Sequence, residues 1–210
     1  MMEITPVTLE GKHVRLEPVR LDHVAALWRA GAYEDIWRYI PYTIRSEEDM
    51  RLFIEAELRK QQAGLVFRFA TIVKPSAQPV GSTSYLNIDR QHRRLEIGGT
   101  WITPAWQRSA VNTEAKYLQL SHAFETLRCI RVEFKTDSLN TKSRQALARI
   151  GAVEEGTLRN HMVMPDGRLR HSVYFSMIES EWPSVKVSLE RLMASYGEHK
   201  ENVHSETTNR

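Results

Sequence analysis

A strand that passes through a short turn into a long helix, followed by another strand, is the feature that most limits how this chain can fold. Residues 95–102 alternate in side-chain character and stop at Pro104, apolar residues at helical spacing follow to Leu127, and residues 130–134 alternate again. This order predicts one βα crossover at the centre of the chain. Strict alternation places Leu95, Ile97, Gly99 and Trp101 on one face of the first strand, and Glu96, Gly98, Thr100 and Ile102 on the other.

The segments around this unit add helices and paired strands. We predict a strand at 14–19, helices from Asp22 and from a Ser46 cap, an antiparallel pair at 66–73 and 80–88, a helix at 139–150, a hairpin at 152–164 and 169–178, and a helix at 181–193. We also expect Asn112 or Thr113 to cap the central helix, and 136–138 to cap the next one. The prediction is one mixed α+β domain over residues 1–196.

Composition excludes several classes of protein. The 210 residues carry 29 Lys and Arg against 26 Asp and Glu, a net charge of +3, which predicts no nucleic-acid surface. The chain has no signal-like start and no long apolar run, and its one cysteine, Cys129, predicts a packing residue in a reducing, cytoplasmic protein that binds no membrane. The eight histidines lack close ligand spacing, so we expect no metal. Residues 197–210 are polar without periodicity and are predicted to be a disordered tail.

Four segments in order resemble the GNAT superfamily of acetyl-CoA-dependent N-acetyltransferases, in the branch of ribosomal-protein N-terminal alanine and serine acetyltransferases. They are LEGKHVRLEP at 9–18, LEIGGTWI at 95–102, DSLNTKSRQALARIG at 137–151 and EGTLRNH at 155–161. The resemblance covers roughly residues 9 to 180. It implies the GNAT fold, which is a mostly antiparallel mixed sheet with splayed central strands and flanking helices, and it implies acetyl-CoA as co-substrate.

In that family, the backbone of a central strand binds the pantetheine arm and the following loop binds the pyrophosphate. The resemblance assigns cofactor contacts to Trp101, Ile102, Thr103, Gln107, Arg108, Ser109, Ala110, Val111, Asn112, Thr113, Asn140 and Arg144. The loop QRSAVN departs from the family pattern, because Ala110 stands where the family has glycine and Asn112 where it has a small residue. If position 110 needs a left-handed backbone, alanine costs roughly 1–2 kcal/mol there. Arg108 is either a compensating phosphate contact or a solvated surface residue.

The resemblance also implies two catalytic residues. Glu96 lies where a strand glutamate acts as general base in the histone-acetyltransferase branch, and the alternative is an edge carboxylate paired with Arg93 or Arg94. Ser143 is the candidate hydrogen-bond donor to the leaving thiolate, because Leu147 replaces a tyrosine that many relatives use there. The alternative for Ser143 is a small residue that allows close helix packing.

The acceptor pocket is expected near Trp37, Tyr39, Tyr42 and His161, and the alternative for the aromatic residues of this segment is core packing. Arg170 and His171 stand where the family often has an aspartate, so no acceptor preference is transferred. We predict acetyl transfer to a peptide or protein α-amine or to a small-molecule amine, by direct attack in a ternary complex of a monomer or homodimer. The alternative is a non-catalytic relative with a degraded phosphate loop.

Overall fold

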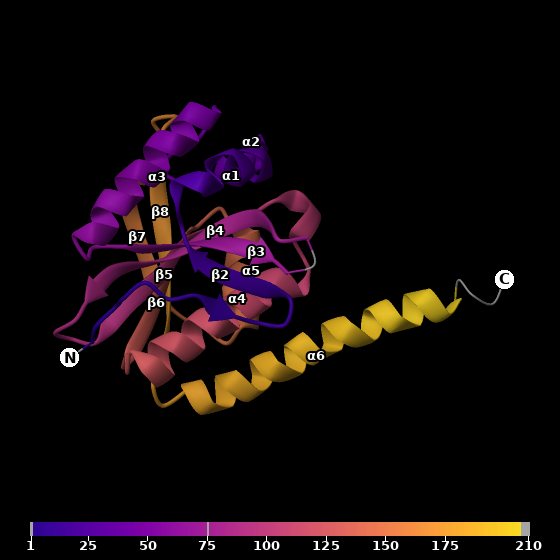
Figure 1. The fold of residues 1–210 in the computed structure, drawn as a ribbon. Helices are drawn as coiled ribbons and strands as arrows, with labels where there is room; N and C mark the ends of the chain where they lie inside the picture. Colours follow the sequence, from indigo (N-terminus) through magenta and orange to yellow (C-terminus); the bar gives the residue numbers. More distant parts are fainter. Residues whose placement is uncertain (1, 75, 207–210) are drawn as a thin grey trace.

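The computed structural model describes residues 2–74 and 76–206, and an eight-stranded sheet is its centre (Figure 1). The strands lie in the order β1-β2-β3-β4-β5-β6-β8-β7, and every neighbouring pair is antiparallel except β5 and β6, which are parallel. Their bounds are β1 Leu9–Glu10, β2 Val14–Pro18, β3 Phe67–Val73, β4 Gln78–Asp89, β5 Arg94–Ile102, β6 Arg131–Asp137, β7 Val153–Val163 and β8 Leu169–Ile178. The predicted succession of strands and helices along the chain and the central crossover are confirmed.

Within the residues that the structure describes, six α-helices cover or extend from this sheet. They are α1 Val24–Gly31, α2 Glu34–Trp37, α3 Glu47–Gln62, α4 Ala110–Ser121, α5 Thr141–Arg149 and α6 Trp182–Glu206, and α4 continues into a π-helical turn, His122–Thr126. Ser46 caps α3 as predicted, since its side chain accepts a hydrogen bond from the Asp49 amide.

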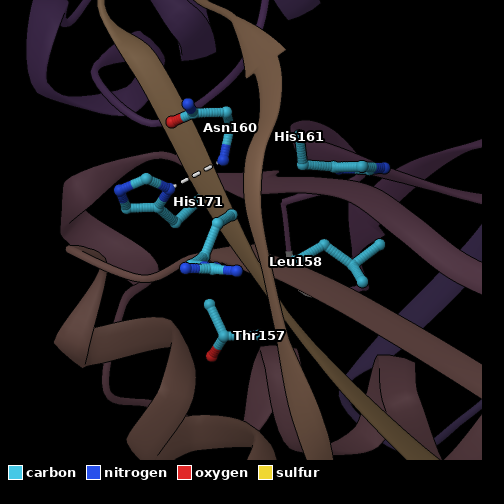
Figure 2. Close-up of a pocket in the computed structure, with 6 residues that line it drawn as sticks. Thr157, Leu158, Asn160, His161 and His171 are labelled. Atoms are coloured by element: carbon cyan, nitrogen blue, oxygen red, sulfur yellow. Dashed lines mark hydrogen bonds between the residues drawn. The ribbon is translucent and has the colours of Figure 1, made fainter.

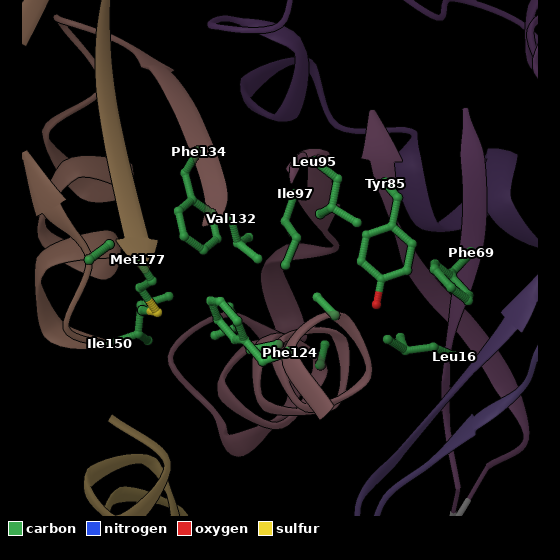
Figure 3. Close-up of a cluster of buried hydrophobic side chains, with 14 of the residues drawn as sticks. Leu16, Phe69, Tyr85, Leu95, Ile97, Phe124, Val132, Phe134, Ile150 and Met177 are labelled. Atoms are coloured by element: carbon green, nitrogen blue, oxygen red, sulfur yellow. The ribbon is translucent and has the colours of Figure 1, made fainter. Parts of the chain in front are cut away.

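Two hydrophobic clusters separate the helices by the face that they cover. The larger lies between the sheet and α4, α5 and the start of α6, and it contains Leu95, Ile97 and the fully buried Tyr85 (Figure 3). Cys129, buried in the same cluster, is a packing residue as predicted. The smaller cluster joins α1–α3 to the other face through Trp37 and Trp101. Helices therefore pack on both faces of the sheet, which is the expected GNAT architecture.

A β-bulge in β5 corrects the predicted faces of this strand. Ser82 of β4 pairs with Trp101 and Ser84 pairs with Gly98, so β5 holds one extra residue between these pairs, and Gly99 has a φ of 58°. Alternation is interrupted there. The prediction that Trp101 shares a face with Leu95 is wrong: Trp101 joins the α1–α3 cluster, whereas Ile102 joins the α4–α5 cluster.

Both expected helix caps near the crossover are also wrong. Ser109, not Asn112 or Thr113, caps α4, and its side chain accepts from the Val111 amide. Asn140 caps α5 in the same way, through its side-chain oxygen. The predicted cap at 136–138 instead lies at the end of β6 and in the turn that follows it. In each case the first polar side chain that reaches the free amides of the first turn decides where the helix begins.

The C-terminal helix is longer than predicted. The sequence predicted a helix ending near 193 and a disordered tail from 197, whereas α6 continues to Glu206 and extends beyond the body of the domain (Figure 1). Glu, His, Lys and Asn each cost less than about 1 kcal/mol of helix free energy relative to alanine, so a polar sequence by itself does not end a helix. The last four residues of the predicted tail lie outside the described residues. Within the described part of the chain, no helix is long and apolar enough to cross a membrane.

Candidate active site

The two central strands, β5 and β6, separate partway along their length. β5 and β6 pair only through Arg94 with Arg131, Leu95 with Val132 and Glu96 with Glu133. Beyond that point β5 follows β4 as far as Ile102, and β6 follows β8 as far as Asp137. The structure thus opens a wedge between the strands, and the inner backbone edge of each is free of the other. The expected splay is confirmed.

The loop that leaves β5 returns directly to a helix N-terminus beside this wedge. The Gln107 side chain donates to the carbonyl of Ile102 at 3.0 Å, and the Ser109 hydroxyl donates to the carbonyl of Trp106 at 2.7 Å. Ser109 also accepts from the Val111 amide at 3.3 Å. The other amides of the first turn of α4 have no intrahelical partner by geometry, so this terminus attracts an anion.

The loop departs from the family pattern without the expected backbone cost. Ala110 is the first residue of α4 and does not have a positive φ, whereas Arg108 does, at 58°. The left-handed conformation therefore falls two residues before the position that the family pattern suggested. The cost expected for Ala110 does not arise, and the strain is at Arg108 instead.

Side-chain burial limits how the loop residues can contact a phosphate. Ala110, Val111 and Thr113 are buried, so only their backbone amides can face a ligand. The side chains of Gln107 and Arg108 are exposed. The Thr113 hydroxyl has a structural partner, because Arg149 of α5 donates to it at 3.5 Å.

Glu96 lies at the last register pair before the wedge, on the α1–α3 face of β5. It is 2% exposed, and its Oε2 accepts from the side-chain amide of Asn87 at 2.8 Å. The ammonium of Lys135, on β6, lies 3.4 Å from the same oxygen. The sequence alternative of a pair with Arg93 or Arg94 is wrong, since Arg94 instead binds Asp89 and Glu133. One cation and one amide thus stabilise a buried carboxylate at the mouth of the wedge.

Three further predicted site residues, Asn140, Ser143 and Arg144, lie at the start of α5, directly after β6. The Asn140 side-chain oxygen is occupied by the Ser143 amide at 3.1 Å, which leaves its side-chain NH₂ as the group that can contact a ligand. Ser143 is half-buried. Arg144 is half-exposed and pairs with Glu154 at 3.2 Å, so its charge is already shared with a surface carboxylate.

The aromatic residues expected in the acceptor pocket separate into packing and lining groups. Trp37 is 5% exposed, donates its indole N–H to the carbonyl of Gly31, and packs 5.4 Å from Trp101, so its side chain belongs to the core. Tyr42 stacks on Phe53 at 4.8 Å, and burial raises the pKa of its hydroxyl. Tyr39 remains half-exposed.

His161 lies on the β7–β8 hairpin, on the same face as Glu96. Its Nδ1 is 3.1 Å from the hydroxyl of Ser172, and its ring meets Tyr174 edge-on at 5.8 Å. Burial, with a smaller effect of Lys135 and Arg170, lowers its pKa, which favours the neutral imidazole at pH 7. His161 and five neighbours line an open groove on this hairpin: Thr157, Leu158, Arg159, Asn160 and His171 (Figure 2).

Sequence reasoning missed the residues that hold the site in shape. Arg68, buried beneath the β5 bulge, donates to Glu57 at 2.8 Å, to Ser82 at 3.1 Å and weakly to the carbonyl of Gly99 at 3.5 Å. The available signal in the sequence was a pair of opposite charges 11 positions apart, Glu57 on a predicted helix and Arg68 on a predicted strand. That spacing does not show that both side chains are buried.

The comparisons with known proteins agree with this geometry. The sequence model described as "Acetyltransferase (GNAT) domain" matches residues 13–153. The chain belongs to the GNAT acetyltransferase family. The "Putative ribosomal N-acetyltransferase YdaF" of Bacillus subtilis is 30% identical over 150 residues, which cover 71% of this chain and 80% of the relative.

Solved GNAT structures share the whole fold. A GCN5-related N-acetyltransferase from Brucella melitensis is 29% identical with a TM-score of 0.84, covering 90% of this chain and 86% of its own. A "putative acetyltransferase" from T. thermophilus is 37% identical with a TM-score of 0.82, covering 90% of this chain and 98% of its own. The protein is therefore an acetyl-CoA-dependent N-acetyltransferase. The free amides at the start of α4 and the unpaired edges of the wedge are chemically suited to the phosphates and amides of this co-substrate.

Proposed function

We propose that the protein transfers the acetyl group of acetyl-CoA to the α-amine of a peptide or protein, with Glu96 as general base. One observation carries this proposal: a buried carboxylate lies where β5 and β6 part, on the strand whose end leads directly into the helix terminus that suits a phosphate. Acetyl-CoA supplies an activated thioester. The chain's own groups orient the amine and remove its proton.

Each residue has a limited task in this proposal. Glu96, held by Asn87 and Lys135, accepts the proton of the attacking amine, either directly or through one water. Backbone amides of β5 near Ile102 polarise the carbonyl under attack. Ser143 donates a hydrogen bond to the departing sulfur, which needs little acid assistance because thiols ionise near pH ~8.5.

The choice of an α-amine rests on how much deprotonation the site must supply. At pH 7 an α-amine with a pKa near 7.7 is ~15% neutral, whereas a lysine with a pKa near 10.4 is on the order of 0.04% neutral. An α-amine therefore needs far less help from a general base than a lysine does. The name of the YdaF relative, a ribosomal N-acetyltransferase, agrees with a protein acceptor.

The non-catalytic alternative had one supporting observation, the altered phosphate loop. That support is weakened because Ala110 lies in the first turn of α4 without a positive φ.

Release of the CoA thiol tests the proposal. The assay uses acetyl-CoA with peptides that begin in Ala or Ser, the same peptides with a blocked N-terminus and an internal lysine, polyamines and aminoglycosides. We expect the free-amine peptides to react at least about 10-fold faster than the blocked ones, because of the difference in neutral amine. Equal rates, or release with polyamines or aminoglycosides alone, would contradict it.

A further inference from the structure

Arg170 on β8 is a buried cation without a carboxylate partner among the described side chains. It is 4% exposed, its Nε donates to the hydroxyl of Ser172 at 3.1 Å, and one Nη1 hydrogen goes to the carbonyl of Tyr39 at 3.1 Å. Among the side chains of residues 2–74 and 76–196, no Asp or Glu oxygen lies within 4.0 Å of its nitrogens. An arginine does not lose its proton in a protein, so this charge persists in the folded state.

Other cations of the same sheet face are paired. Lys135 lies 3.4 Å from Glu96, and Arg168 donates to the buried carboxylate of Asp137 at 2.6 Å. Burial lowers the pKa of Arg170, and the charges of Asp137 and Glu96 oppose that change only from a distance. Taking an unpaired guanidinium out of water is costly, and such a cost is compensated when a ligand supplies the anion.

Arg170 is joined to Glu96 by a continuous run of contacts along one face of the sheet. Ser172 links Arg170 to His161, whose ring packs against Tyr174. Lys135 lies 5.7 Å from the centre of the Tyr174 ring and contacts Glu96. The registers of β5, β6 and β8 place these residues side by side on one face. An acceptor whose amine approaches Glu96 therefore lies along the strands that carry Arg170.

We propose that Arg170 is a specificity-determining residue that binds a carboxylate of the acceptor, so that the preferred substrates carry an acidic group close to the reacting amine. The proposal rests on the function proposed above. Two of the five guanidinium N–H groups of Arg170 donate to Ser172 and Tyr39. The remaining three can donate to a carboxylate, whose two oxygens match the planar guanidinium. The carboxylate belongs either to an acidic residue near the peptide N-terminus or to a free amino acid.

Matched acceptors test this inference on the wild-type enzyme. Peptides that begin Ser-Asp or Ser-Ala-Asp are compared with Ser-Asn and Ser-Ala-Asn, and free serine is compared with serinamide. We expect kcat/KM to be at least about 10-fold higher for the carboxylate member of one pair, because a charged hydrogen bond is lost in the other. The pair that responds identifies the source of the carboxylate.

Arg170→Gln should remove this preference by lowering kcat/KM for the acidic acceptor to that of its amide. Arg191→Gln, on the exposed side of α6, makes the same change in net charge and should keep the preference. If Arg170 only holds the Tyr39 carbonyl, both acceptors of a pair lose activity equally in Arg170→Gln, and the inference is overturned.

A measurement without a variant covers the case in which Arg170→Gln does not fold. The N-acetylated form of the acidic acceptor in the responding pair should inhibit the wild-type enzyme with a Ki at least about 10-fold lower than the N-acetylated form of its amide counterpart. Equal constants would overturn the assignment of Arg170. Absence of acetyl transfer to every amine would instead overturn the proposed function, whereas equal transfer to all matched pairs overturns only this inference.

Discussion

At the scale of single residues, the position of Glu96 depends on two contacts that are distant in sequence. Asn87 comes from β4 and Lys135 from β6, so the carboxylate is held from both neighbouring strands. Alternation predicted that Glu96 faces away from Leu95 and Ile97, which is confirmed. It did not predict burial, because the partners depend on register.

Glu96→Gln should lower kcat about 10²-fold at pH 7, since the amide cannot accept the amine proton. The loss should shrink as the pH rises past ~7.7, where more of an α-amine is already neutral. Steady-state rates from pH 6 to 9 with a Ser-first peptide measure both effects. Glu133→Gln is the matched control, because Glu133 is the register partner of Glu96 but binds Arg94 and Arg131. Parallel pH profiles for wild type and Glu96→Gln would remove Glu96 from the reaction.

At the scale of elements, the start of α4 shows why position 110 does not need the family's glycine. Arg108 takes the left-handed conformation and Ser109 caps the helix, so Ala110 already lies in the first turn. Restoring the family glycine by Ala110→Gly should therefore destabilise the fold, by up to about 1 kcal/mol, because glycine loses more backbone entropy in a helix. Affinity for acetyl-CoA should not rise. Thermal unfolding with and without acetyl-CoA measures both quantities, and tighter binding together with a higher Tm would contradict this account of the loop.

Another element-scale contact anchors the N-terminal strands. Glu114 of α4 is 5% exposed and accepts from the amides of Lys12, His13 and Val14, each at 2.7 Å. A Cβ at Gly11 would lie 2.5 Å from the Glu114 carboxyl carbon, which gives a packing reason for glycine in the segment LEGKHV.

Glu114→Ala should lower the free energy of unfolding by about 3 kcal/mol or more, because three backbone amides lose a charged acceptor. Urea unfolding measures the change. Glu190→Ala is the control: Glu190 accepts from the exposed Tyr117 hydroxyl, and its loss should cost less than about 1 kcal/mol. Equal changes for the two variants would mean that the β1–β2 turn is not held by α4.

At the scale of the whole molecule, the sequence predicted what depends on local pattern and missed what depends on pairing. Period-two and helical spacings located nearly every strand and helix, including the hairpin predicted at 152–164 and 169–178. The bulge at Gly99 was not predictable, because two consecutive glycines have no side chain to reveal a change of face. Burial of Arg68, Glu114 and Arg170 was missed for a related reason: each is charged, and only the tertiary fold makes it buried.

Lys116 gives the whole fold a dependence on pH. It is 5% exposed on the sheet side of α4, donates to Thr100 at 2.8 Å and to Thr83 at 3.3 Å, and burial lowers its pKa to about 7. In the unfolded chain the group titrates near 10.4. Between these values the unfolded state binds a proton that the folded state does not, so stability rises with pH from about 7 toward 10.

The slope attributable to this one proton is at most about 1.4 kcal/mol per pH unit. Lys116→Met should abolish it, so the stability of wild type relative to the variant should increase steadily from pH 7 to 9.5 and stay level below pH 6. Urea midpoints of both proteins across this range measure the difference, with Lys142→Met, an exposed position on α5, as the control that keeps the wild-type slope. Identical pH slopes for wild type and Lys116→Met would mean that Lys116 stays protonated in the folded protein, with its charge compensated by water or by the two threonines.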